Sequence, residues 1–166
     1  STQLYSYEGW EMSHNYDVVI VTVNHRLNML GFLDLSEMGE AYKNSGNLGM
    51  ADLVEALRWV KRNIAAFGGD PDNVTIYGQS GGGGKVSTLM QMPSADGLYH
   101  RAIIQSGVMR SGLLGGDREL SRRIGERTIK NLNLNRDNIK EIKTMEYETL
   151  AAAVAKACEE EKSHPF

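Results

Sequence analysis

The sequence is short of cysteine, proline and long apolar runs. Its 166 residues include one cysteine, Cys158, and three prolines. A single cysteine can form neither an intrachain disulfide nor a cysteine-rich zinc site. No apolar run approaches the ~18 to 20 residues that cross a bilayer, and the N-terminal residues lack the charged, apolar and small-residue regions of a signal peptide. We therefore expect a soluble protein without a membrane span. One free thiol does not fix the compartment, and we favour the cytoplasm over secretion.

The sequence also lacks an excess of charge of either sign. Eighteen lysines and arginines stand against 21 aspartates and glutamates, which gives a formal net charge of -3 at pH 7. A chain of this charge does not generally attract phosphate backbones or anionic membranes, so we expect no nucleic-acid partner. With 41% apolar and 23% charged residues, the composition is that of one ordinary globular domain over residues 1–166.

One series of basic residues follows helical spacing and needs its own explanation. Its members are Arg118, Arg122, Arg123, Arg127 and Lys130. Glu119 lies four residues before Arg123. Glu126 lies four residues before Lys130, and this arrangement is typical of a solvated helix with ion pairs. We interpret the series as a solvated helix face.

Strand and helix patterns alternate over the first two thirds of the chain. Residues 17–23 (DVVIVTV) form a continuous β-branched run, which predicts a strand buried on both faces. Residues 50–67 carry apolar positions at three- or four-residue spacing, which predicts an amphipathic helix that ends at two glycines. A strand at 74–77, a helix at 85–92 and a strand at 102–105 are predicted to follow. This order predicts an α/β fold with parallel strands and crossover helices.

The rest of the chain is predicted to be irregular or helical. Residues 24–49 are rich in glycine, asparagine and aspartate, which indicates a long irregular connection. Three further helices are predicted, at 118–132, 136–145 and 147–161. We divide the domain into a sheet core at 1–107 and a helical segment at 108–166.

The segment that carries chemistry is GQSGG at residues 78–82, which matches the G-x-S-x-G motif between a predicted strand and a predicted helix. A turn this sharp holds the serine in a strained backbone conformation, and side chains two residues away on either side would collide, hence Gly78 and Gly82. Ser80 would then present its hydroxyl at the carboxyl edge of the sheet. The backbone N–H of Gly81 and the helix amino end would point at an oxyanion beside it.

Two other interpretations of this glycine-rich turn exist. In the first, the turn only packs a helix closely against a sheet. In the second, it is a phosphate-binding loop of the form G-x-x-x-x-G-K-[ST]. With Gly84 and Lys85 as the motif's G-K pair, the first glycine falls on Gln79 and the hydroxyl residue on Val86. The register therefore disfavours nucleotide binding, because the cradle and the magnesium ligand are both missing.

An activated serine needs a base, and the chain has four histidines. His100 precedes a predicted strand and, at ~3.3 Å per residue, lies nearly 20 Å from the edge that carries Ser80. His25 lies at the correct edge, but the chain order of this architecture places the base after the serine. His14 precedes a strand and His164 lies in the terminal tail. We expect the base to lie outside this chain.

Several stretches together resemble the type B carboxylesterase family, the carboxylesterase, lipase and cholinesterase group of the α/β-hydrolase fold. The resemblance covers nearly the whole chain and is closest to bacterial members. The matching stretches are DVVIVTVNHRL (17–27), GFL (31–33), GNLGMAD (46–52), WV (59–60), NI (63–64), FGGDPDNV (67–74), GQSGGGGKV (78–86) and QSG (105–107).

The resemblance implies roles for individual residues. Ser80 is the nucleophile, and the Gly81 N–H is one oxyanion-hole donor. Ser106 is a hydroxyl near the acid of the catalytic triad. Arg26 and Asp52 match a family pair that forms a structural salt bridge. No cofactor or metal is implied.

Three positions depart from the family pattern. Gln79 stands where the family usually has glutamate, Gly81 where it has alanine, and His25 where it has tyrosine. The neutral amide of Gln79 puts a buried ionic network behind the turn in doubt, but it leaves the nucleophile unchanged.

The chain has no initiator methionine and ends soon after a helical pattern, so we expect a central fragment of a longer enzyme. In the family, a His-Gly-Gly-Gly loop with further oxyanion donors precedes this region, and the triad acid and histidine follow it. The remainder of the parent chain is therefore the expected partner that supplies both groups. The fragment alone should be inactive.

The leading functional hypothesis is a serine carboxylic ester hydrolase that forms an acyl-enzyme on small-molecule esters. A cholinesterase-like binding module that has lost catalysis is the alternative from another class, and an intact Ser80 argues against it. A nucleotide binder is the third hypothesis.

Overall fold

The computed structural model describes residues 9–107 and 117–163, and these fall into two compact units. We call residues 9–25 with 50–107 the elbow unit, and residues 26–49 with 117–163 the helical unit. His164 lies outside the described residues, as does the start of the helical segment predicted from residue 108. Across the two described ranges, no helix is both long enough and apolar enough to cross a membrane.

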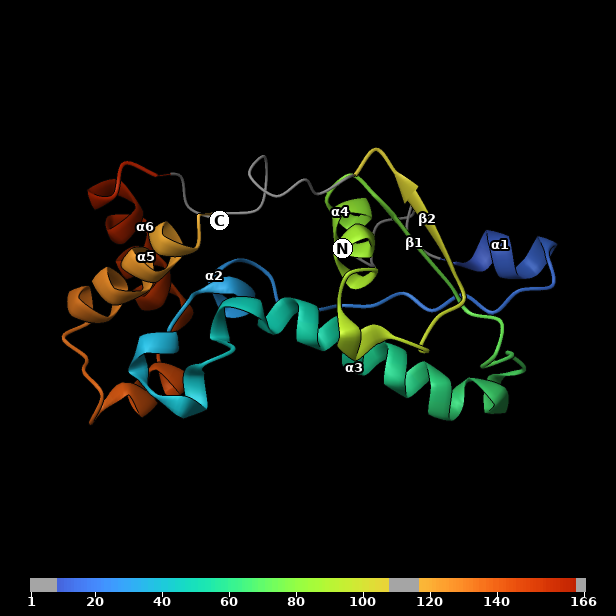
Figure 1. Ribbon diagram of the computed structural model, residues 1–166, viewed down its shortest axis with the longest axis horizontal. Coiled ribbons are helices and arrows are strands. Elements are labelled where there is room, and N and C mark those ends of the chain that lie inside the picture. Colours follow the sequence, from blue (N-terminus) through green and yellow to red (C-terminus); the bar gives the residue numbers. More distant parts are fainter. Residues whose placement is uncertain (1–8, 108–116, 164–166) are drawn as a thin grey trace. The chain divides into compact units, whose positions relative to one another are not determined.

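The elbow unit contains the sheet. Its helices and strands are α1 (Trp10–Asn15), α3 (Leu48–Asn63, in this unit from Met50), β1 (Thr75–Gln79), α4 (Gly81–Leu89) and β2 (Arg101–Gln105). The two strands are parallel, in a register that pairs Thr75 with Arg101 and Gln79 with Gln105. Helix α4 joins them and lies beside the strand pair (Figure 1). The predicted parallel strands with a crossover helix are confirmed.

The long helix of the elbow unit follows its sequence pattern closely. Met50, Val54 and Leu57 recur at helical spacing and are buried, so one face of α3 enters the core. The helix tightens into a 3₁₀ turn at Ile64–Phe67 and stops at Gly68, which has a left-handed φ of 84°. The remaining buried apolar residues of this unit are Val60, Ile64, Ile76, Val86, Leu89 and Ala95.

The strand predicted at 17–23 is wrong for the described residues. This segment has no regular secondary structure, and Val18, Val19, Val21 and Val23 are 36–43% exposed. The β-branched run is suited to a buried strand, but a strand forms only when a neighbour satisfies its backbone N–H and C=O groups. The ladder in the described part of the chain joins β1 to β2 alone.

The helical unit is built from α2 (Asn28–Phe32), α5 (Arg118–Asn131) and α6 (Tyr147–Glu160). Short 3₁₀ helices complete it at Ser36–Met38, Glu40–Tyr42, Ser45–Asn47 and Ile139–Thr144. Both long predicted helices are confirmed, and the short one is a 3₁₀ helix. Residues 26–49 lie in this unit, a grouping that the predicted division at residue 107 does not include. The single domain over 1–166 stays a prediction.

The core of the helical unit is formed mainly between α5 and α6. Its buried members are Leu33, Leu35, Ile124, Ile129, Leu134, Ile139, Leu150, Val154, Ala157 and Cys158. Val154 is only 1% exposed. Thr128 is fully buried among them and donates from its hydroxyl to the Ile124 carbonyl, 2.8 Å away, so its polar group is satisfied.

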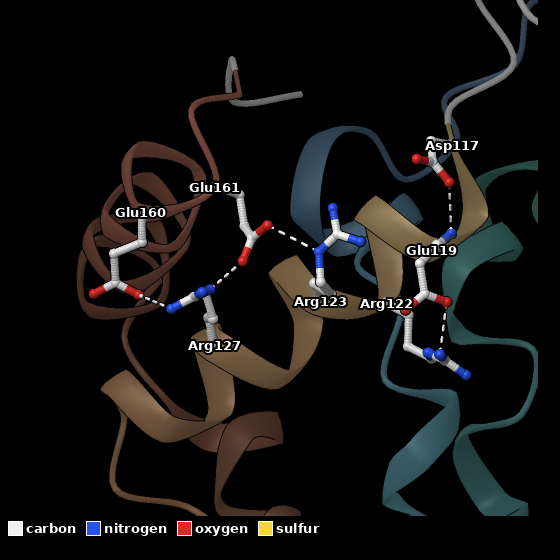
Figure 2. Close-up of polar contacts among 7 residues, drawn as sticks. All are labelled: Asp117, Glu119, Arg122, Arg123, Arg127, Glu160 and Glu161. Carbon is white, nitrogen blue, oxygen red and sulfur yellow. Dashed lines mark hydrogen bonds and ion pairs between the residues drawn. The ribbon is translucent and has the colours of Figure 1, made fainter.

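A pair of arginines on α5 joins that helix to the end of α6 (Figure 2). Arg123 Nε donates to Glu161 Oε2 at 2.9 Å, and Arg127 donates to the other oxygen of the same carboxylate. Both arginines hold the pKa of Glu161 below its usual value by hydrogen bonding. The predicted ion-paired helix face is therefore present, but Arg123 pairs across to Glu161 rather than with Glu119, which contacts Arg122.

Candidate active site

The site is the junction between β1 and α4, where Ser80 is the single residue between strand and helix. Ser80 has φ 52° and ψ -120°, a backbone conformation that non-glycine residues rarely adopt. Two hydrogen bonds hold it there. Its N–H donates to the Gln105 carbonyl at 2.8 Å, and its carbonyl accepts from the Gly84 N–H at 3.0 Å. The strained turn that the motif predicts is therefore present, and β2 and α4 both hold it.

Close backbone approach explains why glycines surround this serine. A β-carbon on Gly78 would collide with the carbonyl group of Gly82, and one on Gly107 would collide with the carbonyl of Ser80. A β-carbon on Gly83 would lie 3.1 Å from the Gln105 carbonyl oxygen, which is tight. Gly107 thus belongs to the turn, although it lies 27 positions after the serine. Its place in the QSG stretch at 105–107 is the signal in the sequence that could have identified it.

One part of the predicted glycine pattern is wrong. A β-carbon on Gly82 would meet nothing within 4 Å among the described residues, so a side chain there has space. Of the two glycines that flank Ser80 at this spacing, only Gly78 would collide, because the backbone of Gly82 fills the place that a Gly78 side chain would need.

The hydroxyl of Ser80 is not used by the helix that it precedes. Serine is a favoured N-cap because its side chain can accept from the first turn, but Ser80 makes no such bond. The residue is exposed, and Gly81 is the first residue of α4. The Gly81 N–H is one of the first-turn donors that a helix leaves unpaired, so it is suited to holding an oxyanion next to the serine.

The structure places three of the four histidines. His100 accepts from the Val74 N–H through Nδ1 at 3.1 Å, which fixes it at the amino ends of β1 and β2, opposite Ser80. His14 lies on α1 and stacks on Trp10 at 4.8 Å between ring centroids. The prediction that His100 lies at the wrong edge is confirmed.

His25 lies in a different environment, close to the charges of Lys85 and Asp52. Its Nε2 is buried and has no hydrogen-bond partner among the described residues. Burial and then the Lys85 ammonium lower the pKa of His25, and Asp52 partly opposes them. Burial and Lys85 therefore favour the neutral imidazole.

The structure leaves the remaining predicted site residues as predictions. Gln79 is the last residue of β1, and Ser106 follows β2 with a φ of 51°. Both residues therefore lie at the same edge of the strand pair as Ser80. Arg26 belongs to the helical unit and Asp52 to the elbow unit, and their predicted salt bridge stays a prediction. Lys85 was not predicted as a site residue, but its ammonium lies 4.0 Å from the position of a β-carbon on Gly81.

Comparison with known proteins gives a consistent picture. The profile of the carboxylesterase family matches residues 1–166. A para-nitrobenzyl esterase of Bacillus subtilis is 50% identical over 105 residues, which cover 63% of this chain and 21% of the relative. A bile salt-activated lipase of Rattus norvegicus is 48% identical over 107 residues, 64% of this chain and 17% of the relative.

Solved structures are similar over almost the full chain. A para-nitrobenzyl (PNB) esterase aligns with a TM-score of 0.87 and 37% identity over 99% of this chain and 34% of its own. An esterase from Clostridium hathewayi, described as able to hydrolyse aliphatic aromatic polyesters, aligns with a TM-score of 0.82 and 54% identity. That alignment covers 96% of this chain and 32% of the esterase. The chain thus spans about a third of these structures.

Proposed function

The chain belongs to the carboxylesterase family, and on that basis we propose that the protein containing it hydrolyses carboxylic esters through Ser80. The observation that carries this proposal is the backbone of Ser80 at the β1–α4 junction, with φ 52° and ψ -120°. That strain exposes a hydroxyl which makes no capping bond. Backbone strain of this kind persists where it serves function.

The proposed reaction is acyl transfer in two steps. Ser80 Oγ attacks the ester carbonyl while a base removes its proton, and the alcohol leaves with a proton returned by the same base. Water then attacks the acyl-enzyme and releases the carboxylic acid. In both steps the Gly81 N–H donates to the oxyanion, and the partial positive charge at the start of α4 supports it.

The base and the acid that orients it are proposed to come from the rest of the protein. His100 lies at the opposite ends of the strands, so it does not serve as this base. The chain spans 21% of the Bacillus subtilis relative, which leaves room for further catalytic residues elsewhere. Ser106 and Gln79 follow and end the two strands, and we propose that they support the triad acid and the turn behind Ser80.

The proposal also includes one structural contact and the class of substrate. We propose that Arg26 and Asp52 form a structural salt bridge. The substrates are proposed to be small-molecule esters, in keeping with the relatives named as esterases.

A fluorophosphonate that labels only activated serines tests the proposal on the full-length protein. We expect one adduct, mapped to Ser80 by mass spectrometry, and hydrolysis of p-nitrophenyl butyrate. Ser80→Ala should abolish the adduct and lower kcat by at least ~10³-fold. Ser94→Ala, at an exposed serine in the Pro93–Ala95 turn, is the matched control and should retain both. An intact protein that neither reacts nor hydrolyses would support the inactive binding module instead.

A further inference from the structure

Lys85 lies closer to the proposed oxyanion donor than its place in the sequence suggests. Helical side chains lean toward the helix N-terminus, so a residue covers the turn before it. Here the four preceding residues, 81–84, are all glycine and carry no side chains that would occupy that turn. The Lys85 ammonium accordingly lies 4.0 Å from the position that a β-carbon on Gly81 would take.

The charge of Lys85 is placed against the usual preference of a helix. A cation is unfavourable near a helix N-terminus, where the macrodipole is positive. None of the ion pairs within residues 9–107 and 117–163 joins the Lys85 ammonium to a carboxylate. The Lys85 charge also acts on the half-buried His25 and lowers the pKa of that imidazole, after the larger effect of burial. A cation this close to the proposed oxyanion donor, with no ion-pair partner in the described ranges, is a candidate for a functional charge.

We propose that Lys85 is a specificity-determining residue, which favours esters that carry a negative charge a few ångströms from the scissile carbonyl, such as monoesters of dicarboxylic acids. This inference rests on the proposed function. When the Gly81 N–H holds the carbonyl oxygen at ~2.9 Å, the groups attached to that carbonyl lie in reach of the Lys85 ammonium. At such distances in a partly desolvated site, the attraction corresponds to a preference of about 10-fold.

The experiment compares two substrates on the full-length protein, p-nitrophenyl hemisuccinate and the neutral p-nitrophenyl butyrate. The measured quantity is the ratio of their kcat/KM values, which cancels any loss of folded enzyme in one preparation. Lys85→Met removes the charge and should lower the ratio about 10-fold, whereas Lys85→Arg should retain it. Lys156→Met, at an exposed lysine of α6, is the control and should leave the ratio unchanged. Added salt should lower the wild-type ratio toward that of Lys85→Met.

Two results would overturn the inference. If Lys85→Met changes neither the ratio nor either kcat/KM value, the lysine does not select the substrate. If the variant slows both esters equally, so that only the ratio is unchanged, the lysine acts on the common oxyanion or on folding. A wild-type protein that hydrolyses neither ester and takes no fluorophosphonate adduct gives a different result, because it overturns the proposed function and this inference together.

Discussion

The strained turn at Ser80 requires glycine at one neighbouring position and not at another. Gly78 and Gly82 are the two positions that show this difference. Gly78→Ala places a methyl group against the Gly82 carbonyl, so the backbone must shift. We expect a loss of about 2 kcal/mol or more in the free energy of unfolding. Gly82→Ala adds a methyl group that meets none of the described residues, in a helix, and should be neutral or stabilise by up to ~1 kcal/mol. Urea unfolding of both variants of the full-length protein measures the difference, and equal losses would contradict the collision.

His25 gives the elbow unit a pH dependence at the same scale. Its folded pKa is lowered from the ordinary value of 6.5, chiefly by burial and then by Lys85. Below pH 6.5 the unfolded chain therefore binds a proton that the folded chain does not. The contribution of His25 to the free energy of unfolding is therefore present in full above pH 6.5 and is lost as the pH falls below it. We expect the melting temperature to drop between about pH 7 and pH 5, and His25→Gln to flatten that drop. An identical pH profile in the variant would show that His25 is not responsible.

At the scale of elements, the sequence predicts those helices and strands that a local hydrophobic pattern determines. Helix α3 and helix α6 have apolar faces at helical spacing, and strands β1 and β2 are short apolar runs bounded by turn residues. The strand at 17–23 could not be predicted this way, because a strand also needs a neighbouring backbone. Helices α1 and α2 were not predicted, since each has only five or six residues and no apolar period to detect.

The residues of the candidate site divide in the same way, into one that a local motif identifies and others that only spatial contacts identify. The motif at 78–82 identifies Ser80 from sequence because glycine spacing and strand context are local. Gly107 and Lys85 become part of the site only through contacts, with the Ser80 carbonyl and beside Gly81. Such contacts depend on how β2 and α4 lie against each other, which no local pattern encodes.

The clamp between α5 and α6 makes a prediction at low pH. Hydrogen bonds from Arg123 and Arg127 lower the pKa of Glu161 from its ordinary 4.5. The stabilisation is present above pH 4.5 and is lost as the pH falls through the lowered folded pKa. Glu161→Gln should therefore lower the melting temperature at pH 7 and weaken its fall below pH 4.5. The exposed Glu159→Gln on the same helix is the control, and equal effects of both variants would exclude the clamp.

At the scale of the whole molecule, the two units have separate cores, and this separation predicts where a core defect is felt. Val154 is 1% exposed, and Val154→Ala removes two methyl groups from the helical unit. We expect a loss of about 2 kcal/mol, which speeds hydrogen exchange of protected amides in α5 and α6 by roughly 30-fold. Protected amides of α3 and α4 should change less. Mass spectrometry of exchanged peptides measures both, and a uniform increase would show that the units unfold as one.

The chain enters the helical unit twice, and residues 50–107 of the elbow unit are synthesised between the two described segments. On the ribosome this order imposes a delay. Leu33 and Leu35, which are 4% and 7% exposed once folded, are synthesised before α5 and α6 exist to cover them. At roughly 5 to 20 residues per second, these leucines wait several seconds for their core. A nascent chain with such a delay offers chaperones an apolar segment, and slowing translation between the two segments would lengthen that exposure.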